Sequence, residues 1–268
     1  MSACIHTIRL RRIWSRIQTE IYPTYPSADF ESQVEMRIDH FKKELMEWLN
    51  TVPRTQPIIT ALSTFSTTEW FQLAYNHSVL LLHRRLLVKA QRHESLQVLL
   101  ECCRAARDIC YLYRKLFLNN PVSYTWGALH ILFLAGLTFL HCLITSPGVR
   151  ATFGQDEVSD TCTSCTIVLV IMAERWKAAA AYRDTWELLA KSTISMLVKA
   201  SSARCVANMN QDIGNQDKWA EALPMPVFSD TTGERRQEMA EYLDDMADIG
   251  MCAGTEELLN QFIGDMSG

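Results

Sequence analysis

The sequence predicts an all-α protein: an antiparallel helical bundle around a buried central helix, followed by a largely disordered acidic C-terminal tail. Three observations predict it. The stretch from Trp126 to Ile144 is apolar almost all the way round, so it must be buried. Several other stretches repeat apolar residues on one helical face and need a shared core. Residues 200–268 carry four basic and thirteen acidic side chains, which concentrates acid in the tail.

The central stretch has a composition that also suits a membrane span. We favour burial in protein, because the stretch is short for a crossing, lacks a basic cluster close by, and accompanies amphipathic segments that need a partner. An integral membrane protein is the third and weakest interpretation. His130 and His141 lie on nearly the same face but about 16 Å apart. They are too far apart to share a metal ion and are expected to be hydrogen-bonded core histidines.

In chain order, apolar spacing predicts a first helix over residues 6–21 and a second that starts near Ser27 or Asp29 and ends at Asn50. A capping box from Ser66 to Glu69 precedes the third helix. The fourth shows the cleanest three-four alternation, from Leu96 to Phe117. After the central helix, a loop through residue 157 leads to a stretch over residues 158–196. Whether that stretch is two helices or one stays open, because residues 177–181 are all good helix formers.

Motifs that would carry chemistry are missing from the sequence. It has no phosphate loop, dinucleotide fingerprint or nucleophile elbow. The pair Cys162 and Cys165 has no second pair at metal-like spacing, and the odd total of nine cysteines indicates reduced, mostly buried thiols. Arg9, Arg12 and Arg16 form a basic ridge, which we interpret as a solvated face rather than a contact for phosphate or an acidic partner. We therefore expect that this protein is not an enzyme. We also expect no catalytic, cofactor-binding or metal-binding residues and no cofactor.

Four segments, in order, resemble a known family: IHTIRLRRIWSRIQTEIYPTYP, WFQLAYNHSVLLLHRRLL, WGALHILFLAGLTFLHCL and CTIVLVIMAERWKAAAAYRDTWELLAK. They are similar to the C-terminal half of the fungal-specific transcription factor domain, the all-helical middle homology region of binuclear zinc-cluster (Zn2Cys6) regulators. The resemblance covers about residues 5–191. It implies a helical regulatory domain over residues 1–199 that controls a separate DNA-binding domain and an activation segment in the nucleus, with the cytoplasm as the alternative location.

The departures from that family also carry expectations. The six-cysteine zinc cluster, its basic linker and the N-terminal half of the middle region are missing from the sequence. We therefore expect a regulator without its DNA-binding domain, which makes no direct sequence-specific contact with nucleic acid. Where the family often has Arg-Pro, this chain has Arg84 followed by Arg85, so the third helix is expected to continue there.

The tail, residues 200–268, is expected to be mostly disordered with short amphipathic helices. From residue 237 onward it has eight acidic residues and no Lys or Arg. Acidic residues keep interleaved apolar side chains solvated until a partner groove takes them. The expected partner-binding residues are Met239, Tyr242, Leu243, Met246, Leu258, Leu259, Phe262 and Ile263. A terminal helix docked on its own bundle is the alternative.

The sequence thus predicts a regulatory module that acts through protein contacts and an activation-like tail. Its partners would be transcription machinery or a DNA-binding regulator, with no membrane association and with an apolar small molecule as a further ligand. The alternative function is a helical small-molecule-binding protein or enzyme with an apolar pocket beside the central helix.

Overall fold

The computed structural model describes residues 3–23, 25, 29–52, 67–88, 95–119 and 126–210. Within these ranges it contains eight helices and no strand, which confirms the all-α prediction. The helices are α1 (Ala3–Ile21), α2 (Phe30–Asn50), α3 (Thr68–Val88), α4 (Leu96–Asn119), α5 (Trp126–Thr145), α6 (Pro147–Thr152), α7 (Gln155–Arg175) and α8 (Ala179–Asn210). Residues 211–268, with all eight predicted partner-binding residues, lie outside the described part.

Two compact units divide the chain, Met1–Ala180 and Ala181–Gly268. The first contains α1 to α7, and the second contains nearly all of α8. The predicted domain boundary at residue 199 falls inside α8, which continues to Asn210. That boundary stays a prediction. On α8 itself, Tyr182, Trp186 and Leu189 are buried, and the Thr193 hydroxyl donates a hydrogen bond to the Leu189 carbonyl.

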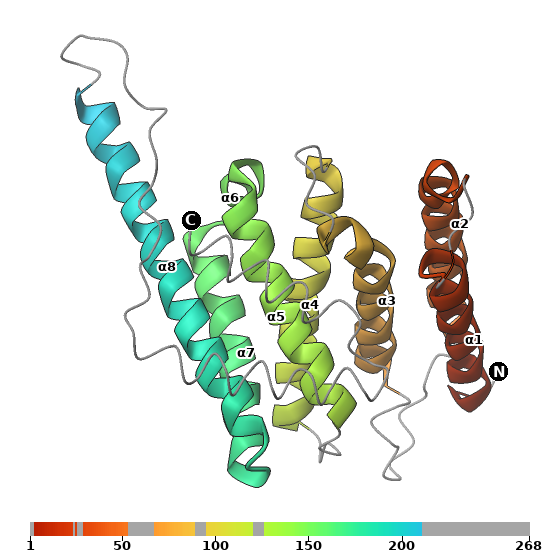
Figure 1. The fold of residues 1–268 in the computed structure, drawn as a ribbon. Helices are drawn as coiled ribbons and strands as arrows, with labels where there is room; N and C mark the ends of the chain where they lie inside the picture. The colour runs from red at the N-terminus through yellow and green to blue at the C-terminus, as the bar shows by residue number, and fades with distance from the viewer. Residues whose placement is uncertain are drawn as a thin grey trace. The chain divides into compact units, whose positions relative to one another are not determined.

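The first three helices share one hydrophobic core in the first unit. α1 and α2 contact each other, and both contact α3. In Figure 1, α1 and α2 are drawn in red, and α3 is the next helix along the chain. Arg16 Nη1 donates to both oxygens of Glu44, at 2.8 and 2.9 Å, and Trp48 Nε1 donates to the His6 carbonyl at 3.0 Å. Residue 16 thus meets residue 44 while residue 6 meets residue 48, so α1 and α2 run antiparallel. The buried apolar residues that they share with α3 are Leu10, Ile13, Ile17, Ile21, Phe30, Val34, Ile38, Phe41, Leu45, Trp48, Phe71, Ala74 and Leu82.

α4 packs against α3, α5, α6 and α7. Its predicted apolar seam is buried over the middle of the helix, from Leu99 to Tyr113, while Leu96 at the start is 46% exposed. Arg107 on α4 bonds Glu157 on α7, and Arg114 bonds Ser164 at 3.3 Å. Both pairs join residues fifty positions apart, so α4 and α7 run parallel. This direction follows because α5 lies between them in the chain and reverses it.

α5 is the buried central helix that the sequence predicts. Every residue from Leu132 to Leu143 is buried. Among the described helices it alone is long and apolar enough to cross a membrane, yet 78% of its apolar window is buried inside the protein. Burial without a single charged side chain is the pattern expected of a core helix, because the neighbouring helices replace the solvent all round.

Several helix ends differ from the predictions. A short helix, α6, replaces the start of the predicted loop, because Ser146 Oγ caps it by accepting from the Val149 amide and Pro147 suits its first position. Trp176 is extended, with φ −143° and ψ 106°, so α7 and α8 are separate helices. The predicted capping box is wrong. Thr67 Oγ1 caps α3 by accepting from the Trp70 amide, and Glu69 pairs with Lys115 instead.

Candidate functional site

A groove lies along the line where α3 meets α4, close to the end of α2. We call it the seam groove. Its volume is about 360 Å³, and its walls are Leu49 of α2, Gln72, Tyr75 and Asn76 of α3, and Asp108, Tyr111 and Leu112 of α4. Three helices therefore contribute to it, and most of its lining side chains are polar or aromatic.

The register between α3 and α4 explains why these residues meet. Lys115 Nζ lies 2.9 Å from Glu69 Oε1, and His83 Nε2 lies 3.5 Å from Glu101 Oε2. The two pairs fix an antiparallel alignment. On α3, Asn76 lies seven positions from Glu69 and from His83. On α4, Asp108 lies seven positions from Glu101 and from Lys115. Because seven residues are close to two helical turns, Asn76 and Asp108 lie opposite each other, midway between the pairs.

An acid–base cluster closes one end of this seam. Lys42 Nζ on α2 lies 2.6 Å from Glu101 Oε2, the oxygen that also faces His83. The side chains of Glu101 and His83 are 26% and 3% exposed, so the carboxylate is largely shielded from water. His83 and then Lys42 stabilise the charged form and lower the pKa of Glu101 to about 2, despite the opposing effect of burial. Burial, together with the Glu101 charge, raises the pKa of the nearby Tyr75 hydroxyl.

The carboxylate of Asp108 is held in place from its own helix. Arg107 Nε lies 2.9 Å and Arg107 Nη2 2.8 Å from Asp108 Oδ1, and the remaining Arg107 nitrogen bonds Glu157 on α7. Both contacts use the same oxygen of Asp108. The guanidinium is thus committed to two acids and fixes the Asp108 side chain at the edge of the groove.

Several polar groups that line the groove make no hydrogen bond within the part of the chain that the structure describes. They are the side-chain amides of Gln72 and Asn76, the hydroxyls of Tyr75 and Tyr111, and Asp108 Oδ2. Donors and acceptors that converge on one concave site without protein partners are typical of a binding site.

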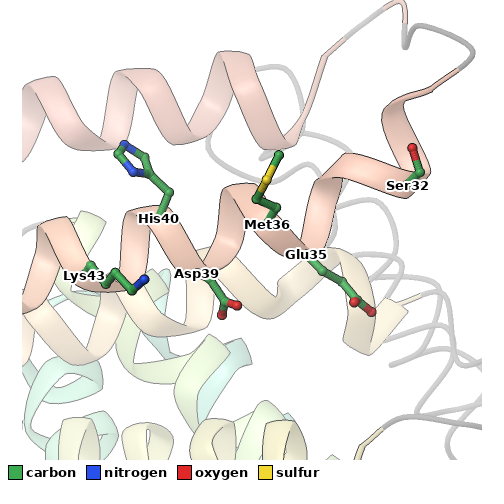
Figure 2. A pocket seen from close by; sticks show the side chains of 6 residues that line it. All are labelled: Ser32, Glu35, Met36, Asp39, His40 and Lys43. Atoms are coloured by element: carbon green, nitrogen blue, oxygen red, sulfur yellow. The ribbon is translucent and has the colours of Figure 1, made fainter.

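A second hollow, of about 560 Å³, runs along α2. Its described lining residues are Ser32, Glu35, Met36, Asp39, His40 and Lys43, all from one helix. Figure 2 shows Glu35 and Asp39 projecting to one side of the ribbon and Met36 and His40 to the other. The described side chains diverge, so they do not by themselves surround a small substrate. Neither this hollow nor the seam groove includes a residue of α5, where the alternative apolar pocket was expected.

The buried histidines and cysteines lie in the core. His130 and His141 are 4% and 2% exposed, as expected of core histidines. A third histidine, His77, has a pKa lowered to about 3, mainly because burial disfavours its charged form. Burial raises the pKa of Cys162 to about 12 and also raises that of Cys165, which makes both thiols poor nucleophiles. Over the described ranges, no group of three or more His, Cys, Asp or Glu side chains has an arrangement that could hold a metal ion.

Comparisons with known proteins point to regulators. The chain is 26% identical over 174 residues to a positive regulator of purine utilization from Emericella nidulans. This match covers 58% of this chain and 16% of that protein. It is 27% identical over 118 residues to an uncharacterized transcriptional regulatory protein from Saccharomyces cerevisiae, covering 37% of this chain and 9% of that one. Its relatives are fungal transcriptional regulators, not enzymes. The chain spans less than a fifth of the length of either, and no family model or solved structure matches it.

The seam groove was not predicted from sequence, although a signal for it exists. Glu69, Asn76 and His83 repeat every seven residues, and Glu101, Asp108 and Lys115 repeat every seven residues on the facing helix. Such polar repeats flank the apolar seam of a helical pair. Only the apolar positions entered the sequence-based prediction, because they define the core.

Proposed function

We propose that this chain is a regulatory and interaction module of a fungal transcription regulator, of the middle-region type that accompanies zinc-cluster DNA-binding domains. The observation that carries this proposal is the 174-residue match to a regulator. The all-α architecture and the inert buried thiols support it. The module works in the nucleus through protein contacts with transcription machinery or with a DNA-binding regulator, and it catalyses no reaction.

The effector part of the proposal is the acidic segment from residue 237 to residue 268. Its apolar anchors alternate with eight acidic residues and no basic ones, so they stay soluble until a coactivator groove buries them. Fused to an unrelated DNA-binding domain, the segment is expected to activate a reporter gene. Changing Leu259, Phe262 and Ile263 to alanine should abolish most of that activation, because large apolar anchors supply most of the affinity of such helices.

The matched control changes Asn260, Gln261 and Ser267 to alanine, which leaves every anchor and every charge in place. Activation should survive in this control. A silent unmodified fusion, or equal activation by the fusion and its anchor variant, would remove the effector assignment and favour a terminal helix that completes the bundle.

The chain is further expected to show no sequence-specific DNA binding. Arg9 and Arg12 are exposed on α1 and present only a few positive charges for phosphate contacts. Weak binding that rests on a few phosphate contacts falls steeply with salt. Fluorescence anisotropy should therefore show equal binding to unrelated duplexes at about 50 mM salt and none near 150 mM. Discrimination between a genomic promoter fragment and its scrambled counterpart at the higher salt concentration would contradict this expectation.

A further inference from the structure

Ion pairs hold the helices that form the walls of the seam groove. Glu69–Lys115 anchors one end at 2.9 Å, and Lys42–Glu101 anchors the other at 2.6 Å. Asp108 is held by Arg107 between them. Helices that are already held in register need little rearrangement when a ligand binds, so a small groove of this kind can hold a small molecule.

Two carboxamides lie on the α3 wall. Gln72 and Asn76 are four positions apart, which places them one above the other on the same face of the helix. Each carboxamide offers a donor and an acceptor side by side, the arrangement that pairs bidentately with the edge of a nucleobase. Opposite Asn76, the carboxylate of Asp108 can accept an N–H from the same ligand.

Flat apolar surfaces complete the groove. The rings of Tyr75 and Tyr111 line it from opposite helices, and Leu49 and Leu112 add aliphatic contacts. Aromatic side chains stack on the faces of planar heterocycles, while Asn and Gln read their edges. The groove therefore combines the two kinds of contact that recognise a base.

Size and charge narrow the ligand further. A volume of about 360 Å³ lies at the low end for small-molecule sites and suits one or two fused rings. The described lining includes no Lys or Arg. The neighbouring cations Lys42, Arg107 and Lys115 are each bound to acids. A phosphate group would be repelled by the Asp108 carboxylate, and no described lining residue offers a positive charge to bind it, which disfavours a nucleotide.

We propose that the seam groove binds a neutral, planar nitrogen heterocycle with adjacent hydrogen-bond donors and acceptors, the chemistry of a free nucleobase. The ligand would be read by Gln72, Asn76 and Asp108 and stacked by Tyr75 and Tyr111. None of the described residues that line this site belongs to the segment tested by the reporter experiment. Failure of that experiment would therefore leave the binding proposal standing, and failure of the binding experiment would leave the effector proposal standing.

The test is isothermal titration calorimetry of the full chain with adenine, hypoxanthine, cytosine and uracil, each up to about 1 mM. Saturable binding of at least one base is expected. The corresponding nucleoside monophosphate should bind at least about tenfold more weakly because of its charge, and indole, which is planar but lacks the paired donor and acceptor, should bind at least about tenfold more weakly too.

Asn76→Ala should weaken binding of that base about tenfold or more, since it removes a bidentate contact. The variant should fold, because Asn76 is only half-buried and alanine favours a helix. Tyr111→Ala should also weaken binding, whereas Tyr111→Phe keeps the stacking face and should retain most of it. The matched control is Gln18→Ala, at an exposed position of α1, which should bind like the unmodified chain.

Three outcomes would overturn the proposal: no saturable binding of any of the four bases, unchanged affinity in folded Asn76→Ala, or indole binding as tightly as the bases. Circular dichroism and thermal unfolding of each variant establish that it is folded before its affinity is compared.

Discussion

Phe139→Ala should destabilise the first unit by about 3–5 kcal/mol, the largest effect that we expect from a single substitution. Phe139 is fully buried in α5, and its ring meets Phe153 edge to face with centroids 5.8 Å apart. Alanine removes the buried ring and leaves a cavity that the packed helices on either side can fill only in part. Urea denaturation followed by circular dichroism measures the change in the free energy of unfolding.

Leu118→Ala on α4 is the matched control, because Leu118 is 59% exposed. Its cost should stay within about 0.5 kcal/mol. A Phe139→Ala cost below about 1 kcal/mol would show that α5 does not pack as a core helix. Recovery of the unmodified protein only with detergent would contradict the burial of α5 within the protein and favour the membrane interpretation.

Glu101→Gln should destabilise the protein by about 1–3 kcal/mol at neutral pH, because Lys42 and His83 lose their shared carboxylate. The effect should depend on pH. The pKa of Glu101 is about 2 in the folded chain and 4.5 without these partners. A lowered folded pKa contributes stability that is fully present above pH 4.5 and is lost as the pH falls towards 2. The difference between the unmodified chain and the variant should therefore shrink over that range.

Urea denaturation at several pH values between 3 and 7 measures this difference, with Glu47→Gln as the matched control. Glu47 is exposed on the same helix as Lys42, and no ion pair of it is seen in the described part of the chain. Its substitution should cost less than about 0.5 kcal/mol and show little pH dependence. A Glu101→Gln cost that is constant from pH 3 to pH 7 would contradict the charge-based explanation.

The sequence alone predicted most of the helices and the buried faces of α4 and α5. The apolar spacing from Leu99 to Tyr113 predicted the buried side of α4, and the absence of charge from Trp126 to Ile144 predicted that α5 would be the core helix. Both predictions hold because helix formation and the direction of an apolar face depend on residues within a few turns of each other. The position of Asn50 before Pro53 likewise marked the end of α2.

The tertiary structure decided the contacts between residues that lie far apart in the chain. Glu69 looked like part of a capping box, but docking of α4 brings Lys115 to it and leaves Thr67 to cap α3. The Glu101 cluster and the seam groove exist only because α2, α3 and α4 meet in one register. That register is set by the fit of whole helical faces, and a shift of one helical turn, about 5.4 Å, would separate Asn76 from Asp108 while leaving every local pattern in the sequence unchanged.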